Sequence, residues 1–533
     1  MLKPKFYLFF VFVACFTACQ NTPPAATGDF AMGLTFDEAA YAKIPKKASL
    51  TRGLYDNLPN AVTLEAFCPA IGDQKKKQTC VGWSSAYYAR TILWAREHNL
   101  SNQAEITDNS FAASFTYRAA SMVMENVDMD CSLGSNIPIA LEIMRKYGAM
   151  PTRYFKDECY AGELSNDIVA KANPFRIQSF TRILDKSDPE AMQIKKIQKS
   201  LSEGNPVVIG MSVIRSFGRC RSEVWEVTGD QEVLGGHALC VIGYDNNKAG
   251  GAFQIINSWG TGWGNNGFVW VKYADFLHYT HEACEMVVNI RRPEPPKPEP
   301  IAPEPVKPEP VKPAPEPEPQ PAPVAQKEHL SGSLQLVLDS GSEIAMTAQT
   351  VGGMDVVPAN NDKPKPPAPK PNNPLMPTNT SGYFAYKTAQ AYSSGTRFRI
   401  YLNNNEPAFV YAFSLDNTRR FSQLFPYASN ISAALNYSKN TVALPDEDHY
   451  IQLDNQKGTD VLCILYAKEE LDINQIQSAM QGSKGSFFEM LYAALGDKLI
   501  QGNHIQYNPN NINFKAELDN GFIVPIIVEF THN

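Results

Sequence analysis

The sequence predicts an α+β protein with two folded regions, and three patterns lead to this prediction. Apolar residues recur at helical spacing from residue 80 to about 165, and short apolar strands follow between about 200 and 290. Fifteen prolines then fall within residues 293–323, after which strand-like segments return. A chain of 533 residues, 44% of them hydrophobic, can bury more than one core. The strands expected in the first region are 206–212, 238–242, 253–256, 268–271 and 286–290.

The N-terminus resembles a bacterial export signal. Residues 6–18 form an apolar run of thirteen residues behind a positively charged start, which is too short to span a bilayer as a mature helix. The string Phe16-Thr-Ala-Cys19 resembles the lipobox of bacterial lipoproteins, in which the cysteine is acylated. We expect residues 1–19 to be a lipoprotein signal peptide and residues 20–58 to be a tether with a short extension. The chain would then be lipid-anchored in the bacterial cell envelope, facing the periplasm or the extracellular space; an ordinary cleaved signal is the alternative.

A cysteine opens the first helical stretch. Thr79 is a candidate N-cap, which places Cys80 in the first turn of a helix. The positive end of the helix dipole favours the thiolate form of such a cysteine, and the thiolate is the nucleophile. The alternative is a buried structural or disulfide-bonded cysteine, since the chain contains ten cysteines. The choice between the two depends on residues far downstream.

Two downstream strings supply the partners that a nucleophilic cysteine needs. In Gly235-Gly-His237-Ala-Leu-Cys-Val-Ile-Gly-Tyr244, a histidine opens an apolar strand. In Asn257-Ser-Trp259-Gly-Thr-Gly-Trp-Gly-Asn-Asn-Gly267, an asparagine follows a strand and precedes a glycine-rich turn. Cysteine, histidine and asparagine in this order provide a nucleophile, a base and a group that orients the base.

These strings resemble the papain-like cysteine peptidases, and the resemblance covers roughly residues 59–291. The 257–267 string is highly specific for that family, and Gln74 lies six residues before Cys80, where the family places its oxyanion-hole glutamine. The resemblance implies a helical lobe packed against a β-barrel-like lobe, with the site in the cleft between them. Many members carry a long inhibitory propeptide, and residues 20–58 leave no room for one.

The chain also departs from the family pattern. His237 and Asn257 follow Cys80 by 157 and 177 residues, more than the usual spacing of about 130–150, which implies insertions. The family's Cys-Gly-Ser-Cys-Trp at the nucleophile is changed, because Lys77 and Val81 replace the first cysteine and the tryptophan. These changes affect the local disulfide pattern and the wall of the cleft, and leave the three chemical positions in place.

The resemblance implies acyl transfer from a peptide bond to Cys80, followed by hydrolysis. His237 would be the ion-pair partner and general acid, Asn257 would hold its imidazole, and Trp259 would shield that hydrogen bond from water. Gln74 and the backbone N–H of Cys80 would form the oxyanion hole. The implied substrate-binding positions are Gly134, Ser135, Gly236 and Ala238. The substrate is a peptide or protein, and neither a metal nor another cofactor is implied.

The other cysteines fit an oxidising compartment. Cys131 with Cys159 and Cys220 with Cys284 are candidate disulfides, and the second pair resembles a family disulfide near the catalytic histidine. Cys240, in the strand after the histidine, is expected to be a buried thiol. The sequence leaves the connectivity open.

A proline-rich linker at residues 292–327, expected to be extended polyproline II, precedes the second folded region. Residues 328–533 predict a mainly-β, sandwich-like accessory domain with a proline-rich insert at about 357–378, and the strand at Phe409–Phe413 with its neighbouring turns resembles a bacterial β-sandwich family of uncharacterised function. We expect an independently folding binding or positioning module, open to a protein or glycan partner. Its expected strands are 333–338, 343–350, 397–402, 408–415, 423–425, 459–466 and 522–530, with a helix at 486–495.

The sequence as a whole predicts an exported papain-like cysteine endopeptidase. Two alternatives stay open: a cysteine acyltransferase or amidase on the same fold, and a non-catalytic surface binding protein. The net charge of −7, without a basic patch, argues against a nucleic-acid partner.

Overall fold

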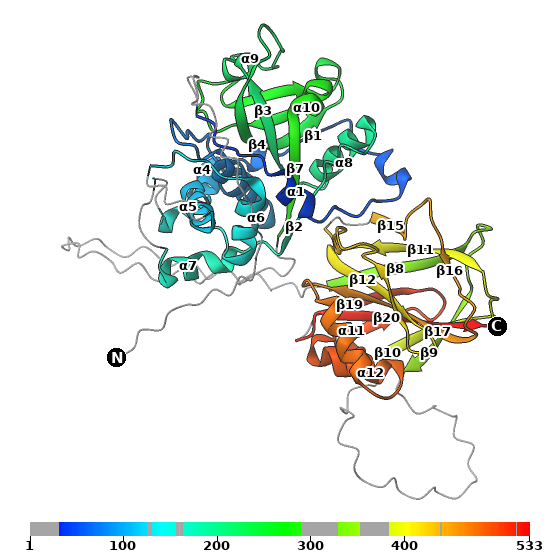
Figure 1. Ribbon diagram of the computed structural model, residues 1–533. Helices are drawn as coiled ribbons and strands as arrows, with labels where there is room; N and C mark the ends of the chain where they lie inside the picture. The colour runs from blue at the N-terminus through cyan, green and yellow to red at the C-terminus, as the bar shows by residue number, and fades with distance from the viewer. Residues whose placement is uncertain are drawn as a thin grey trace, which may run out of the picture.

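The computed structural model describes residues 31–124, 130–155, 159, 164–288, 329–351, 383–436, 440–518 and 520–533. The predicted lipidation site at Cys19, the proline-rich linker and the proline-rich insert lie outside these residues. Within the described part, no helix is long and apolar enough to cross a membrane. Two folded regions are visible in Figure 1, the first coloured blue to green and the second lime to red.

The first region has a helical lobe and a β lobe, as predicted. The helical lobe contains one continuous helical stretch that begins at Cys80 and passes from α to π geometry and back. The helices of this lobe are α2 (Cys80–Gly82), η3 (Trp83–Arg90), α3 (Thr91–Glu97), α4 (Gln103–Asp108), α5 (Ala113–Val123), α6 (Ile137–Lys146) and α7 (Asn166–Ala172).

Helix α6 shows how the sequence sets the ends of an element. The Asn136 side chain accepts the backbone N–H of Ile139 at 2.9 Å, which caps the first turn. Leu141 and Met144 are fully buried on the inner face. Gly148 has a φ of +96°, a conformation that favours glycine and ends the helix. The helix confirms the pattern that predicted it.

The β lobe is an antiparallel sheet with strand order β2-β7-β3-β4-β5-β6, and β1 pairs with β4. Its elements are β1 (Ala61–Thr63), β2 (Ser179–Arg182), α8 (Glu190–Ser202), β3 (Val207–Ile214), α9 (Arg215–Gly218), β4 (Val233–Asp245), β5 (Ala252–Ile256), β6 (Phe268–Lys272), α10 (Tyr273–Tyr279) and β7 (Thr280–Val287). The strand expected at 286–290 begins six residues earlier than predicted. The buried carboxylates of Glu282 and Glu285 interrupt its apolar pattern, which is why hydropathy did not reveal it.

The second region contains two sheets, with strand orders β13-β12-β17-β20-β10-β9 and β15-β11-β8-β19-β18; β14 pairs with β12, and β16 with β11. One hydrophobic cluster includes residues of both sheets, so they pack as a sandwich. The strands are β8 (His329–Leu338), β9 (Met346–Val351), β10 (Tyr383–Thr388), β11 (Arg397–Asn404), β12 (Ala408–Leu415), β13 (Phe421–Phe425), β14 (Ala434–Leu435), β15 (Asn440–Leu444), β16 (Ile451–Gln452), β17 (Gly458–Ala467), β18 (Ile505–Tyr507), β19 (Asn513–Glu517) and β20 (Ile523–His532), and the helices are α11 (Ile473–Gly482) and α12 (Phe487–Leu495). The predicted strands and the helix at 486–495 are confirmed, whereas β10, β14, β15, β16, β18, β19 and α11 were not predicted.

A segment of the N-terminal extension, residues 44–56, lies between the two regions. The backbone N–H of Lys46 donates to Asn430 O of the second region at 2.6 Å, and the N–H of Lys47 donates to Arg182 O of the first at 3.1 Å. The buried side chains that this segment adds to the core of the second region are Ala48, Leu50 and Tyr55. The two regions were expected to fold independently. That expectation did not include these contacts between them.

A buried polar cluster stands at the same junction. The Lys47 ammonium contacts the Glu285 carboxylate of β7 and the Asn436 side chain of the second region. Glu285 also accepts hydrogen bonds from Ser200 Oγ at 2.6 Å and from Asn436 Nδ2 at 2.9 Å. Burial by itself would raise the pKa of Glu285, but Lys47 and these hydrogen bonds hold that pKa below its ordinary value. Burial lowers the pKa of Lys47 to about 8.

Candidate active site

Cys80 is the first residue of α2 and is completely buried. Thr79 is the N-cap residue, as predicted, although its hydroxyl makes no capping hydrogen bond. Cys80 Sγ accepts the backbone N–H of Ala238, which approaches from the β lobe, at 3.4 Å. A Cβ at Gly82 would lie 2.3 Å from Ala113 O, so only glycine lets this helix pack so closely against α5. The nucleophile candidate therefore lies at the contact between the two lobes.

His237 lies in β4 and is also completely buried. Its Nε2 lies 2.8 Å from Asn257 Oδ1, an acceptor, so Nε2 carries the proton and donates. The same Oδ1 accepts the backbone N–H of Ser258 at 2.7 Å, which fixes the orientation of the amide. His237 Nδ1 is buried and has no hydrogen-bond partner among the described residues. An imidazole in this tautomer has a free lone pair on Nδ1 that can take a proton from a thiol.

Trp259 and Gln74 lie beside this pair. The Trp259 ring stacks on the His237 ring with their centroids 4.3 Å apart. Gln74 Oε1 accepts a hydrogen bond from Ser258 Oγ at 2.6 Å, which leaves Nε2 as the donor end of the amide. Ser258 thus orients two of the predicted site residues at once, a role that the sequence did not indicate.

Residues 31–36, which we call the strap, cross the cleft between the lobes. The backbone N–H of Leu34 donates to Gly236 O at 3.1 Å, and the N–H of the next residue donates to Ser135 O at 2.9 Å. The Ser135 N–H in turn donates to Gly33 O at 2.8 Å. The strap is therefore an extended segment that forms an antiparallel bridge with the chain at Gly236 and a parallel bridge with the chain at Ser135.

The strap also takes the hydrogen bonds of the predicted oxyanion-hole donor. Gln74 Nε2 donates to Ala31 O at 3.0 Å and to Met32 O at 3.1 Å. Trp259 Nε1 donates to Ala31 O at 2.9 Å. Six residues of the N-terminal extension thus lie in the cleft, a placement that the sequence analysis did not predict. Those six residues carry no pattern from which this position could be predicted.

Three of the four predicted substrate-binding positions, Gly134, Ser135 and Gly236, border the strap. A Cβ at Gly134 would lie 2.4 Å from Gly33 O, and one at Gly236 would lie 2.5 Å from Leu34 O. Glycine at both positions thus allows the extended segment to approach. Ser135 bonds the strap through its backbone, and Ala238 bonds Cys80 instead.

The covered cleft reverses the expected protonation of the catalytic pair. Burial raises the pKa of the Cys80 thiol to about 12, although the N–H groups of Ala238 and Val81 oppose the shift. Burial lowers the pKa of His237 to about 4, although its bond to Asn257 opposes that shift. In this conformation burial favours the neutral thiol and the neutral imidazole, the opposite direction from the predicted thiolate–imidazolium pair.

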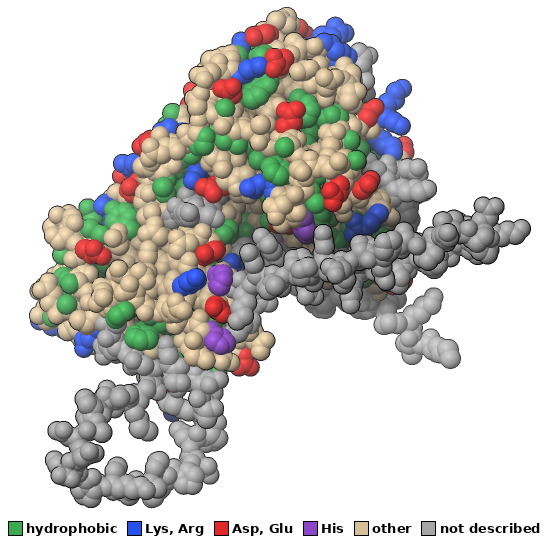
Figure 2. Space-filling view, turned by 180° about the vertical axis from the view of Figure 1, so that it is seen from behind, with side chains coloured by type: hydrophobic (Ala, Val, Ile, Leu, Met, Phe, Trp, Pro, Cys, Tyr) green, Lys and Arg blue, Asp and Glu red, His purple; other side chains and the backbone are tan. Residues whose placement is uncertain are grey.

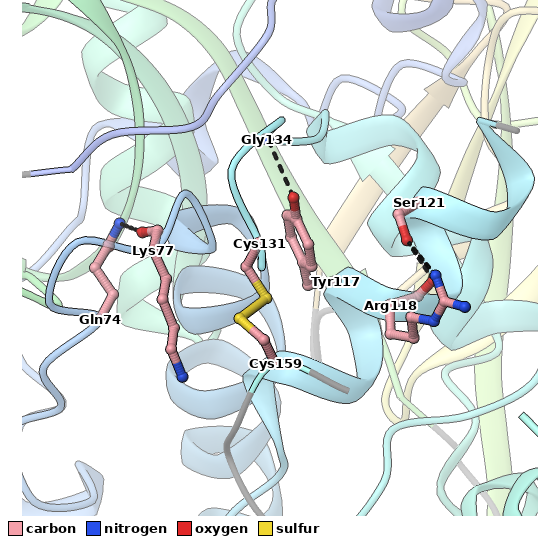
Figure 3. Close-up of a disulfide and its surroundings, with 8 residues drawn as sticks. All are labelled: Gln74, Lys77, Tyr117, Arg118, Ser121, Cys131, Gly134 and Cys159. Atoms are coloured by element: carbon pink, nitrogen blue, oxygen red, sulfur yellow. Dashed lines mark hydrogen bonds between the residues drawn. A yellow bond between two sulfur atoms is a disulfide. The ribbon is translucent and has the colours of Figure 1, made fainter. Parts of the chain in front are cut away.

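One of the two candidate disulfides is present. Cys131 and Cys159 are joined close to Gln74 and Lys77, and Figure 3 shows this bridge beside the Tyr117 hydroxyl, which accepts the Gly134 N–H at 3.2 Å. The bridge thus supports the loop that leads to the substrate-binding positions.

The other candidate pairing, Cys220 with Cys284, is wrong. Both are separate buried thiols; Cys220 Sγ lies 3.5 Å from Ser222 Oγ in a loop, whereas Cys284 lies within β7 opposite Val208. Cys240 is a buried thiol, as predicted.

Charged side chains of both signs lie on the surface of the two regions. Acidic and basic side chains are interspersed over both regions on the face shown in Figure 2. Among the described residues, no group of histidine, cysteine, aspartate or glutamate side chains could hold a metal ion.

Two family models match the chain. The papain family cysteine protease model matches residues 121–289, and the model of a domain of unknown function, DUF4384, matches residues 391–470. The first match contains His237 and Asn257 but begins after Cys80, so the place of the nucleophile candidate rests on the geometry described above.

Individual proteins resemble the first region. An uncharacterized peptidase C1-like protein of Acanthamoeba polyphaga mimivirus is 28% identical over 244 residues, 43% of this chain and 71% of that protein. Cathepsin B-like cysteine proteinase 3 of Ostertagia ostertagi is 35% identical over 75 residues, 14% of this chain and 42% of that protein, so the chain spans less than half of that relative. The solved structure of xylellain, a cysteine protease from Xylella fastidiosa, is 18% identical with a TM-score of 0.40, covering 49% of this chain and 97% of that one.

The chain carries a papain-family cysteine protease domain, and as an enzyme it is a papain-like cysteine protease. Its C-terminal region contains a DUF4384 domain.

Proposed function

We propose that this chain is an exported cysteine endopeptidase that cleaves peptide bonds with Cys80, His237 and Asn257, and that the described conformation is its occluded form. The proposal rests chiefly on His237. Its Nε2 donates to Asn257 while its buried Nδ1 has no hydrogen-bond partner in the described part of the chain. The imidazole ring is thus oriented to act as a base. Cys80 Sγ accepts a hydrogen bond from the backbone N–H of Ala238, the residue after His237.

The mechanism requires the strap to leave the cleft. His237 Nδ1 then takes the proton of the Cys80 thiol, and the thiolate attacks the carbonyl carbon of the substrate. Gln74 Nε2, released from the strap carbonyls, and the backbone N–H of Cys80 hold the oxyanion. The imidazolium returns its proton to the leaving amine, and water then hydrolyses the thioester and restores the free thiol.

Substitutions of the site residues test this proposal. Cys80→Ala is expected to abolish hydrolysis of a mixed peptide library, and Asn257→Ala to weaken it. Gln74→Ala should lower kcat/KM by about 10²–10³-fold, because it removes one oxyanion donor. Each variant is compared with the wild type for cleavage and for its melting temperature.

Three results would contradict the proposal. Wild-type cleavage by Cys80→Ala would remove the nucleophile assignment. Turnover of simple amides without peptide cleavage would indicate an acyltransferase or amidase. A wild-type protein that forms no covalent adduct with a thiol-directed epoxide after strap displacement would indicate a binding protein.

The location of the enzyme is a proposal as well. The lipobox-like Phe16-Thr-Ala-Cys19 supports a lipid anchor that holds the peptidase at the cell envelope. Metabolic labelling with a fatty-acid probe is expected to mark the wild type and to leave Cys19→Ala unmarked. Equal labelling of the two proteins would remove the anchor from this account.

A further inference from the structure

A serine, a histidine and a carboxylate meet in the second region, where β17 begins and β20 ends. His532 Nε2 lies 3.0 Å from Ser394 Oγ, and His532 Nδ1 lies 3.3 Å from Asp460 Oδ2. The imidazole is completely buried, whereas Ser394 and Asp460 are partly buried. All three residues lie outside the peptidase domain, and the sequence analysis gave them no role.

The antiparallel pairing of β17 with β20 sets the carboxylate beside the imidazole. In this ladder Gly458 lies opposite His532, and Asp460 lies opposite Phe530. Asp460 and His532 are therefore diagonal neighbours, and their side chains lie on the same face of the sheet. The register of the two strands thus holds these two side chains close together.

Ser394 reaches the imidazole from a tight turn before β11. The Thr396 N–H closes this turn by donating to Ser393 O at 3.1 Å, and the Tyr392 N–H joins the turn to β20 by donating to Thr531 O at 2.9 Å. The backbone therefore fixes the turn against the end of β20. This contact places the Ser394 hydroxyl within hydrogen-bond distance of the histidine.

The carboxylate selects the tautomer of the imidazole. His532 Nδ1 and Asp460 Oδ1 have no hydrogen-bond partner among the described residues, so the 3.3 Å contact with Oδ2 is close but not aligned. Hydrogen bonds between catalytic groups are often long or poorly aligned before a substrate binds. A carboxylate on this side favours the proton on Nδ1, which leaves the Nε2 lone pair to accept the Ser394 hydroxyl proton.

Other carboxylates lie near this cluster. Burial raises the pKa of Asp460, the His532 side chain opposes that shift, and the carboxylates of Asp454 and Asp416 raise the pKa further. His532 is therefore the neighbour that favours the ionised form of Asp460. The acidic surroundings also disfavour an anionic substrate.

We propose that Ser394, His532 and Asp460 form a second acyl-transfer site, which hydrolyses neutral or cationic carboxylic esters. Ser394 is the nucleophile, His532 is the general base, and Asp460 is a positioning residue that orients the imidazole. An ester is the substrate class because an alkoxide leaves an acyl carbon more readily than an amide nitrogen does. The activity goes beyond the proposed peptidase function and does not use Cys80.

The reaction needs only the ester and water. His532 Nε2 takes the hydroxyl proton while Ser394 Oγ attacks the acyl carbon, and the imidazolium then gives that proton to the leaving alkoxide. The alcohol departs and the acyl group stays on Oγ as a serine ester. Water, deprotonated by the same imidazole, hydrolyses this ester, which releases the carboxylic acid and restores the Ser394 hydroxyl.

A fluorophosphonate probe tests for an activated serine. We treat the full chain carrying Cys80→Ala and expect an adduct on Ser394, located by peptide mass mapping. Adding Ser394→Ala should remove this adduct, and adding Ser393→Ala, which changes an exposed serine of the same turn, should keep it. His532→Gln should slow the labelling by about 10²–10⁴-fold, because it removes the base. Absence of an adduct on Ser394, or equal labelling with and without His532, would overturn the inference.

Hydrolysis of p-nitrophenyl acetate tests the substrate class. The chain carrying Cys80→Ala should hydrolyse this ester with saturation, and adding Ser394→Ala should abolish the activity. Asp460→Asn should lower kcat by about tenfold or more with KM unchanged, because an interaction of the transition state is lost. Asp454→Asn, which changes an exposed carboxylate nearby, should keep the rate. Equal ester hydrolysis with and without Ser394, or labelling of Ser394 without ester turnover, would overturn the esterase assignment and leave the peptidase proposal untouched.

Discussion

Gly33→Val is expected to displace the strap from the cleft and to raise the rate of peptide hydrolysis by about tenfold or more. Gly33 has a φ of +121°, and a Cβ there would lie 2.4 Å from the backbone oxygen of Gln78, which cannot swing aside. The conformation alone costs an L-residue about 1–2 kcal/mol, and about 1.4 kcal/mol shifts an equilibrium tenfold. The measurement compares kcat/KM of the full-length wild type and Gly33→Val on the same peptide mixture.

Thr35→Val is the matched control, because that side chain belongs to the same strap but is exposed. It should leave the rate at the wild-type value. Adding Cys80→Ala to Gly33→Val should abolish the gain. A Gly33→Val protein with the wild-type melting temperature and the wild-type rate would mean that the strap does not limit access.

Replacement of Lys47 by alanine is expected to lower the free energy of unfolding by about 3–5 kcal/mol. Lys47 and Glu285 are both buried, and the ammonium contacts both that carboxylate and Asn436 of the other region. Removal of the ammonium leaves a buried carboxylate without this cation, which is far more costly than the loss of an exposed ion pair. Denaturant unfolding followed by tryptophan fluorescence gives the change in free energy.

An exposed ion pair near the same segment provides the comparison. Lys195 Nζ lies 2.8 Å from Asp56 Oδ1, and both side chains are more than a third exposed. Lys195→Ala should therefore change the free energy of unfolding by only about 0–1 kcal/mol. Equal effects of the two alanine substitutions would show that the buried cluster does not hold the two regions together.

The sequence was sufficient to predict the fold class and to bring the catalytic candidates to one place. Each of them belongs to a short sequence string that also forms the element carrying it; His237, for example, lies within the strand β4. Strands with regular apolar patterns were predicted for the same reason. The start of β7 was predicted too far along the chain. Its buried carboxylates, Glu282 and Glu285, break the apolar pattern, and their surroundings come from residues distant in the sequence.

The strap and the protonation of the site could not be predicted from the sequence. Residues 31–36 form neither helix nor sheet by themselves, and their backbone bonds go to Gly236, Ser135 and Gln74, all distant along the chain. The charged catalytic pair was predicted from the helix N-terminus and the family resemblance, and neither of them indicates a segment over the cleft. When the strap covers Cys80 and His237, burial raises the pKa of the thiol and lowers the pKa of the imidazole. The effect of burial exceeds that of the helix N-terminus, so the neutral forms of both groups are favoured.

The pH dependence of alkylation at Cys80 tests the central claim most directly. The wild type and Gly33→Val are treated with iodoacetamide between pH 5 and 9, about the range in which free thiols and activated thiols differ, and the labelled cysteine is identified by peptide mass mapping. In the wild type burial raises the pKa of the Cys80 thiol well above pH 8, so little thiolate is present and labelling should be very slow. In Gly33→Val we expect rapid labelling of Cys80 that persists at about pH 6, because an open thiolate–imidazolium pair has a thiol pKa of roughly 3.5–7.5. Labelling that rises only near pH 8.5, about where a free cysteine ionises, or that falls on another cysteine, would contradict the account.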